Sequence, residues 1–152
     1  MVRRLLPVFL VSVLVLPLSG CDIGVNSDGP AAIKREGGSL LVAVCADIHA
    51  GRILFEERQP SDGSSWDQFW DGEGNLVVAA GTILSTSEFD PPLLPSEHKA
   101  DPSMRPGSEI GVLLADRSGR YSISASFTVP QGGLSESTWL HPDGSTTQEA
   151  CG

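Results

Sequence analysis

Residues 121–129 alternate strictly between apolar and hydroxyl-bearing side chains, and this pattern constrains the fold more than any other feature. The apolar positions are Tyr121, Ile123, Ala125, Phe127 and Val129, with Ser or Thr between them. A period of two places every apolar side chain on one face of an extended strand, whereas a helix would spread them around its circumference. One apolar and one polar face are typical of an antiparallel sheet with one solvated side.

Turn signals extend this prediction to most of the chain. The 152 residues include 17 Gly and 11 Pro, and no long helical period is present. We therefore expect an all-β fold, a single antiparallel β-sandwich of about six to eight strands. The expected strands are residues 39–48, 52–57, 76–84, 109–116, 119–129 and 137–140, with 146–151 as a further candidate.

The first 20 residues have the organisation of an export signal. Arg3 and Arg4 precede an apolar run over residues 8–16. This run is shorter than the roughly 20 residues that a transmembrane helix needs, and it has the length of the apolar region of a signal peptide. We therefore predict that residues 1–20 are a signal peptide.

The segment Leu18-Ser19-Gly20-Cys21 that ends this signal resembles the lipobox of bacterial lipoproteins. In that class the signal is cut before the Cys, and the Cys sulfur is diacylated. The resemblance implies that Cys21 carries a lipid anchor and that the protein is held at the cell membrane, facing the extracytoplasmic side. Two or more acyl chains give stable anchoring.

The residues after Cys21 are rich in Gly, Pro, Asn and Asp, which resist a packed structure. We therefore expect residues 21–38 to be the acylated Cys and a flexible tether, and residues 39–152 to be the β-sandwich domain.

Cys45 and Cys151 are the two cysteines that remain. Export implies an oxidising compartment, in which an even pair of thiols normally forms a disulfide. We predict this bridge. Two free thiols remain the alternative, and the absence of a Cys-x-x-Cys spacing disfavours a metal or catalytic role.

Residues 116–121, followed by the alternating segment and Val129-Pro130, resemble a late strand of bacterial immunoglobulin-like sandwiches. The resemblance implies that Tyr121, after a Gly turn, packs at a sheet corner. Ile123 stands where antibody domains carry a Cys, so the disulfide differs. The whole chain also resembles small lipoproteins of actinobacteria in its lipobox, acidic body and late Cys pair, which implies no activity.

Trp66, Phe69 and Trp70 form the densest aromatic cluster. A helical turn capped by Ser65 and Gln68 would place the three rings on one face. Two interpretations are open: this face closes one end of the sandwich, or it is a binding platform for sugar rings or a protein partner.

The Pro-rich connection over residues 89–107 contains five prolines and the apolar pair Leu93-Leu94. Connections of this length in compact domains are usually functional or mobile. This one is either a mobile crossover or a docking loop that presents its two leucines.

Other chemistry has little support in the sequence. The formal net charge of −9 argues against nucleic-acid partners. His49, His98 and His141 are widely separated, and the acidic run Asp71-x-Glu73-x-Asn75 lacks key positions of an EF-hand. We therefore expect no catalytic residues, metal or cofactor.

The sequence favours a non-enzymatic binding or accessory module of the cell envelope, held to the membrane by its lipid anchor, with an envelope protein or a glycan as candidate partner. One alternative is a structural or stress-related envelope lipoprotein without a dedicated ligand. A small metal-dependent hydrolase is the third hypothesis.

Overall fold

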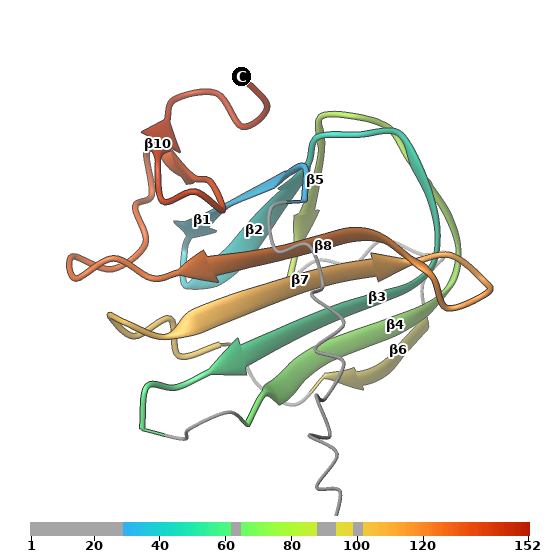
Figure 1. Ribbon diagram of the computed structural model, residues 1–152, viewed down its shortest axis with the longest axis horizontal. Helices are drawn as coiled ribbons and strands as arrows, with labels where there is room; N and C mark the ends of the chain where they lie inside the picture. The colour runs from blue at the N-terminus through green and yellow to red at the C-terminus, as the bar shows by residue number, and fades with distance from the viewer. Residues whose placement is uncertain (1–28, 62–64, 88–93, 99–101) are drawn as a thin grey trace, which may run out of the picture.

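The computed structural model describes residues 29–61, 65–87, 94–98 and 102–152. These residues form an all-β sandwich of two antiparallel sheets (Figure 1), which confirms the predicted fold class. The first sheet has the strand order β10-β9-β1-β2-β5, and the second sheet has the order β6-β4-β3-β7-β8.

Ten strands are present in the described part of the chain, more than the six to eight expected, because several are very short. The strands are β1 (Ala31–Glu36), β2 (Ser39–Val44), β3 (Ile48–Arg58), β4 (Asp67–Val78), β5 (Thr82–Ser85), β6 (Leu94–His98), β7 (Glu109–Ala115), β8 (Tyr121–Thr128), β9 (Trp139–Leu140) and β10 (Thr146–Thr147).

The boundary between tether and domain was predicted wrongly. Residues 31–36 belong to the expected tether, yet they form β1 and pair with β2 along its whole length. Ala31, Ala32 and Ile33 are buried, so this short apolar segment gains enough packing to be ordered. The sandwich therefore begins before residue 39.

Two strand boundaries also differ from expectation. The expected strand 39–48 is divided between β2 and the start of β3, and β3 continues unbroken through residues 50–51 into the expected strand 52–57. The expected strand 76–84 is divided by a turn in which Gly81 adopts a φ of 88°. A glycine takes this left-handed conformation at little cost, which suits Gly81 to the turn between β4 and β5.

The alternation in β8 is confirmed except at its first residue. Ile123, Ala125, Phe127 and Val129 are buried in the core, but Tyr121 is 51% exposed. The register with β7 shifts between Leu114 and Ala115, where the pairing passes from Ile123 to Tyr121. One extra residue in a strand shifts the alternation of side chains, so that the residues before it point to the opposite face of the sheet. The expectation that Tyr121 packs at a sheet corner is therefore wrong.

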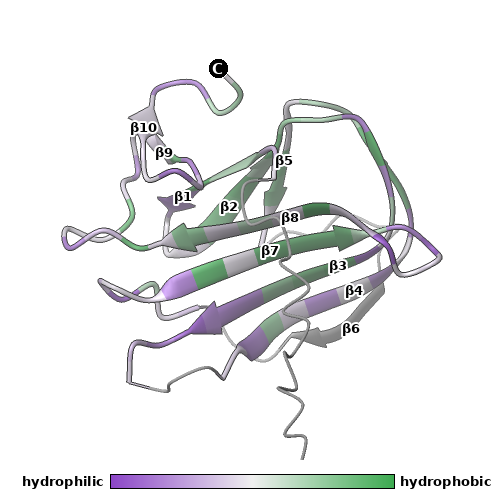
Figure 2. Cartoon of the chain, in the orientation of Figure 1, coloured by the Kyte–Doolittle hydropathy of each residue, from purple (hydrophilic) through white to green (hydrophobic). Residues whose placement is uncertain are grey.

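The main core lies between the two sheets. It combines Ile33, Leu40, Val42 and Val44 of the first sheet with inward side chains of the second, including Ile53, Phe55, Ile110, Val112, Leu114 and Phe127. Figure 2 shows the apolar character of β2 and β7 and the hydrophilic end of β3.

The C-terminal segment extends the first sheet beside β1 through β9 and β10, and its side chains cover part of the outer face of that sheet. Trp139 packs with Ala32, Leu41 and Ala43, and Ala150 lies against the same cluster. The predicted disulfide between Cys45 and Cys151 is confirmed, with the two Cα atoms 5.3 Å apart. The bridge and Trp139 together hold residues 139–151, here called the C-terminal strap, against this sheet.

Candidate functional site

The predicted aromatic cluster does not form one exposed face. Residues 67–78 are a strand rather than a helical turn, and Phe69 and Trp70 are both buried. Their ring centroids lie 6.2 and 5.5 Å from that of Phe55. Successive side chains of a strand normally point to opposite faces, but the register against β3 is irregular beside Phe55, so both rings face inward. The core interpretation is therefore favoured for Phe69 and Trp70.

Trp66 lies apart from this pair, on the outer face of the second sheet. The guanidinium carbon of Arg58 is 4.8 Å from the Trp66 ring centroid, and Arg58 also pairs with Glu109. Gly111 makes room for the indole, since a Cβ there would be 3.3 Å from a ring carbon. Trp66 is half-buried and already has a cationic partner, which makes it a covered ring rather than an open platform.

Two other sequence-predicted sites remain predictions. Cys21 and Leu93 lie outside the described residues. Leu94 begins β6, the edge strand beside β4, but its side chain is not among those described.

The titratable residues noted in the sequence are dispersed. His49 is exposed, and His141 shares a hydrogen bond of 2.7 Å with Thr147 in the C-terminal strap. Asp71 forms an ion pair with Arg52, so it is not a free ligand of a calcium loop. Within the described ranges, no three His, Cys, Asp or Glu side chains gather as a metal site.

A groove of about 510 Å³ on the outer face of the second sheet brings together side chains of several strands. Its volume is within the range of small-ligand sites. It lies where the outward residues of β3, β4 and β7 meet the turn between β7 and β8. The lining residues include Arg52, Leu54, Glu73, Leu113, Arg117 and Tyr121, and the groove is hereafter called the Arg52 groove.

Arg52 is held in a fixed orientation at this groove. Its Nε and Nη2 groups each donate a 2.9 Å hydrogen bond to a different carboxylate oxygen of Asp71. The hydrogen bonds to Asp71 raise the pKa of Arg52 above its ordinary value, despite the opposing effect of burial. The side chain of Asp71 is only 11% exposed, whereas that of Arg52 is 46% exposed. The largely buried carboxylate therefore holds the more exposed guanidinium group in place. The two N–H donors of Nη1 remain outside this ion pair.

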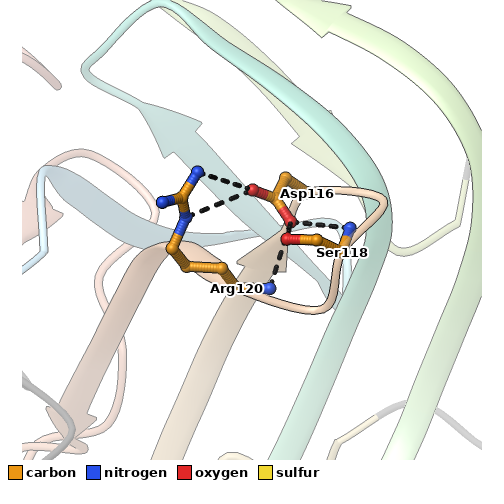
Figure 3. Close-up of polar contacts among 3 residues, drawn as sticks. All are labelled: Asp116, Ser118 and Arg120. Carbon is orange, nitrogen blue, oxygen red and sulfur yellow. Dashed lines mark hydrogen bonds and ion pairs between the residues drawn. The ribbon is translucent and has the colours of Figure 1, made fainter.

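The turn between β7 and β8 is organised by Asp116 (Figure 3). Its Oδ1 accepts hydrogen bonds from the backbone N–H of Ser118 and Arg120 and from the Ser118 hydroxyl, at 2.8, 3.1 and 2.5 Å. The Arg120 guanidinium donates to Oδ2. The Ser118 hydroxyl and these other donors lower the pKa of Asp116 to about 2. A charged, acceptor-only carboxylate thus fixes the shape of the turn.

Gly51 lets this turn lie directly on β3. A Cβ at Gly51 would be 2.9 Å from the Arg117 Cα and from the Arg117 backbone nitrogen. Backbone atoms cannot move aside as a side-chain tip can, so only glycine permits this contact. The contact places the exposed Arg117 at the wall of the Arg52 groove.

The floor of the groove is apolar. Leu54 and Leu113 are neighbours in the pairing of β3 with β7, and both point outward and are half-buried. Tyr121 adds an exposed ring because of the irregular register at the start of β8. The groove therefore combines two guanidinium groups, an aromatic ring and an apolar floor.

The sequence alone does not reveal this site. Residues 116–121 stand out in it only through a resemblance to immunoglobulin-like strands, and no sequence pattern links Arg52 to Arg117. A leucine in a strand can be recognised as pointing outward only when the inward face of that strand is known. Which face is inward depends on how the strands pair and how the two sheets pack.

No helix within the described part of the chain is long and apolar enough to cross a membrane. Comparisons with protein-family models, with curated proteins and with solved structures find no match to this chain.

Proposed function

We propose that this protein is an extracytoplasmic, lipid-anchored binding module of the cell envelope without catalytic activity. The observation that supports its binding role is the Arg52 groove, which combines an oriented cation with a half-buried apolar floor. A few fixed polar groups around an apolar surface are typical of ligand sites. The sequence and the remaining geometry support the other parts of the proposal.

The lipobox at Leu18–Cys21 supports the anchor, and the Cys45–Cys151 bridge fits an oxidising compartment. The eight residue-to-residue steps from Cys21 to Gly29 span at most about 28 Å when fully extended. This short reach would keep the domain beside the membrane surface.

We also propose that the sandwich is immunoglobulin-like. In such domains strands A, B and E share one sheet, strands C, F and G share the other, and variable-type domains add C′. The orders β1-β2-β5 and β4-β3-β7-β8 fit these two sets in chain order. Two features depart from antibody domains: the C-terminal strap beside β1, and a disulfide that does not join the two sheets through β7.

Fractionation of cells tests the anchor. Wild-type protein is expected in the membrane fraction, and the Cys21→Ser variant is expected to leave it, because acylation requires the thiol. Cys45→Ser is the matched control and should stay in the membrane. Membrane retention of folded Cys21→Ser protein would contradict the anchoring.

Site-specific crosslinking tests the binding role. A photoreactive amino acid replaces Leu113 in the groove or, as a control, Val77, which is 67% exposed on another part of the surface. Discrete crosslinked products from position 113 alone are expected in the membranes of the expressing cell. Equal labelling from both positions, or none from position 113, would contradict a binding role for the groove.

A further inference from the structure

We propose that the Arg52 groove binds the free C-terminal carboxylate of a peptide whose last residue is apolar. This inference rests on the proposed function, because it takes the groove to be the binding face, and it adds the chemistry of the ligand.

The charge of the ligand follows from the two arginines. Arg52 is oriented by its paired hydrogen bonds to Asp71, and its Nη1 donors are left for a further acceptor. A guanidinium group held in this way loses little conformational freedom when it binds a planar carboxylate. Arg117 supplies a second exposed cation at the same groove. The pair favours one carboxylate over a neutral group.

The acidic residues limit the ligand to a small negative charge. Glu73 lies opposite Arg52 in the register of β3 with β4 and lines the groove, as does Asp116. The whole chain has a formal net charge of −9. A polyanion would meet the like charges of Glu73 and Asp116 beside the two arginines, and a single terminal carboxylate would meet less repulsion.

The apolar floor identifies what lies next to that carboxylate. Leu54 and Leu113 offer no hydrogen-bonding groups, so they suit an apolar side chain and would leave the hydroxyl groups of a sugar unpaired. The exposed ring of Tyr121 adds apolar contact area with few rotatable bonds. A C-terminal residue such as leucine presents its carboxylate and its side chain from one Cα, which matches an arginine beside an apolar floor.

The volume is also suited to the end of a chain. A groove of about 510 Å³ is large enough for the last few residues of a peptide, including the terminal side chain and its carboxylate.

Tyr121 provides a direct probe, because it is the single tyrosine of the chain. Full-length protein in detergent micelles is labelled with 3-fluorotyrosine, which gives one ¹⁹F resonance from the groove. It is titrated with acetyl-Ala-Leu carrying a free carboxylate, with the same peptide as its C-terminal amide, and with a galacturonic acid disaccharide. The free carboxylate is expected to shift the resonance saturably, and the amide and the acidic sugar are not.

Arginine variants test the assignment. Arg117→Gln should weaken binding of the free carboxylate by about tenfold, as expected for the loss of one charged hydrogen bond. Arg52→Lys keeps the charge but removes the planar fork and should weaken binding at least as much. The matched control is Arg35→Gln, an exposed arginine on β1, which should leave the titration unchanged. Because Arg117 is exposed, its variant is expected to fold normally.

The outcomes separate this inference from the proposed function. Equal shifts with the carboxylate and amide peptides, or an unchanged titration in Arg117→Gln, would overturn the carboxylate assignment. A saturable shift with the acidic sugar alone would overturn the peptide as ligand while leaving the groove as a binding face. No shift with any probe would overturn this inference, and crosslinking from position 113 would then decide whether the groove binds another class of partner.

Discussion

The outer faces of the two sheets differ in how their apolar side chains are covered. In the first sheet, Ala32, Leu41 and Ala43 point outward, but Trp139 and Ala150 of the C-terminal strap cover them. In the second sheet, Leu54 and Leu113 point outward at the Arg52 groove, and no strap formed by the described residues covers them.

This difference shows how the chain handles outward apolar residues. On the first sheet, Trp139 covers Ala32, Leu41 and Ala43 beside the Cys45–Cys151 bridge, whereas Ile83 of β5 is 53% exposed. On the second sheet, Leu54 and Leu113 are half-buried and lie beside two arginines and a tyrosine. The covered part of the first face thus contributes to stability, and the second face is the one that we propose for binding.

Removing the disulfide should have the largest effect on this contrast. The Cys45→Ala, Cys151→Ala protein loses a crosslink with a sequence separation of 106 residues, which the chain-entropy model values at about 4–5 kcal/mol. We expect lower stability in urea and faster hydrogen exchange in the C-terminal strap than in β7. The reduced wild-type protein is the control and should behave like the variant. Unchanged exchange in the strap would show that the bridge does not hold it.

Removing the cover residue should have the next largest effect. Trp139→Ala uncovers Ala32 and Ala43 and removes the contact with the Lys34 ammonium, 4.9 Å from the ring centroid. We expect a loss of about 3 kcal/mol in urea unfolding. Trp66→Ala, on the outer face of the second sheet, is the matched control and should cost about 1 kcal/mol. Similar losses for both variants would contradict the difference between the faces.

Shortening the groove floor should have a smaller effect on stability. Leu54→Ala and Leu113→Ala remove half-buried side chains from an uncovered face, so each should cost about 1 kcal/mol or less. Ile53→Ala, one residue away but fully buried, should cost about 2–5 kcal/mol. Thermal unfolding of the three variants measures this. A large loss for Leu54→Ala would mean that the groove floor is part of the core.

The smallest effect concerns the turn that carries Arg117. The pKa of Asp116 is lowered from 3.8 to about 2 in the folded protein, so folding favours its charged form. Its stabilising contribution is present above the unfolded value of 3.8 and is lost as the pH falls through about 2. The difference in unfolding free energy between wild type and Asp116→Asn should therefore shrink as the pH is lowered across this range. A difference that stays constant with pH would contradict the role of the carboxylate.

Local patterns predicted several features correctly. The alternation of Ile123, Ala125 and Phe127 predicted the inward face of β8, and the count of thiols predicted the Cys45–Cys151 bridge. These features depend on neighbours in the chain or on the number of available partners. They are therefore readable without knowing which strands pair.

Other features depended on pairing between distant strands. The outward position of Tyr121 and the inward position of both Phe69 and Trp70 arise from register irregularities against β7 and β3. Residues 31–36 form a regular strand because they pair with β2, although the Gly and Pro that flank them are typical of a tether.

The candidate site belongs to this second group. The β-fold, the inward face of β8 and the cysteine pair follow from sequence patterns alone. The ion pair of Arg52 with Asp71 and the contact of Arg117 with Gly51 follow from the way the strands are brought together. Side-chain periodicity is a property of one strand, whereas a groove is formed where side chains of three strands and a turn converge, which depends on register and sheet order.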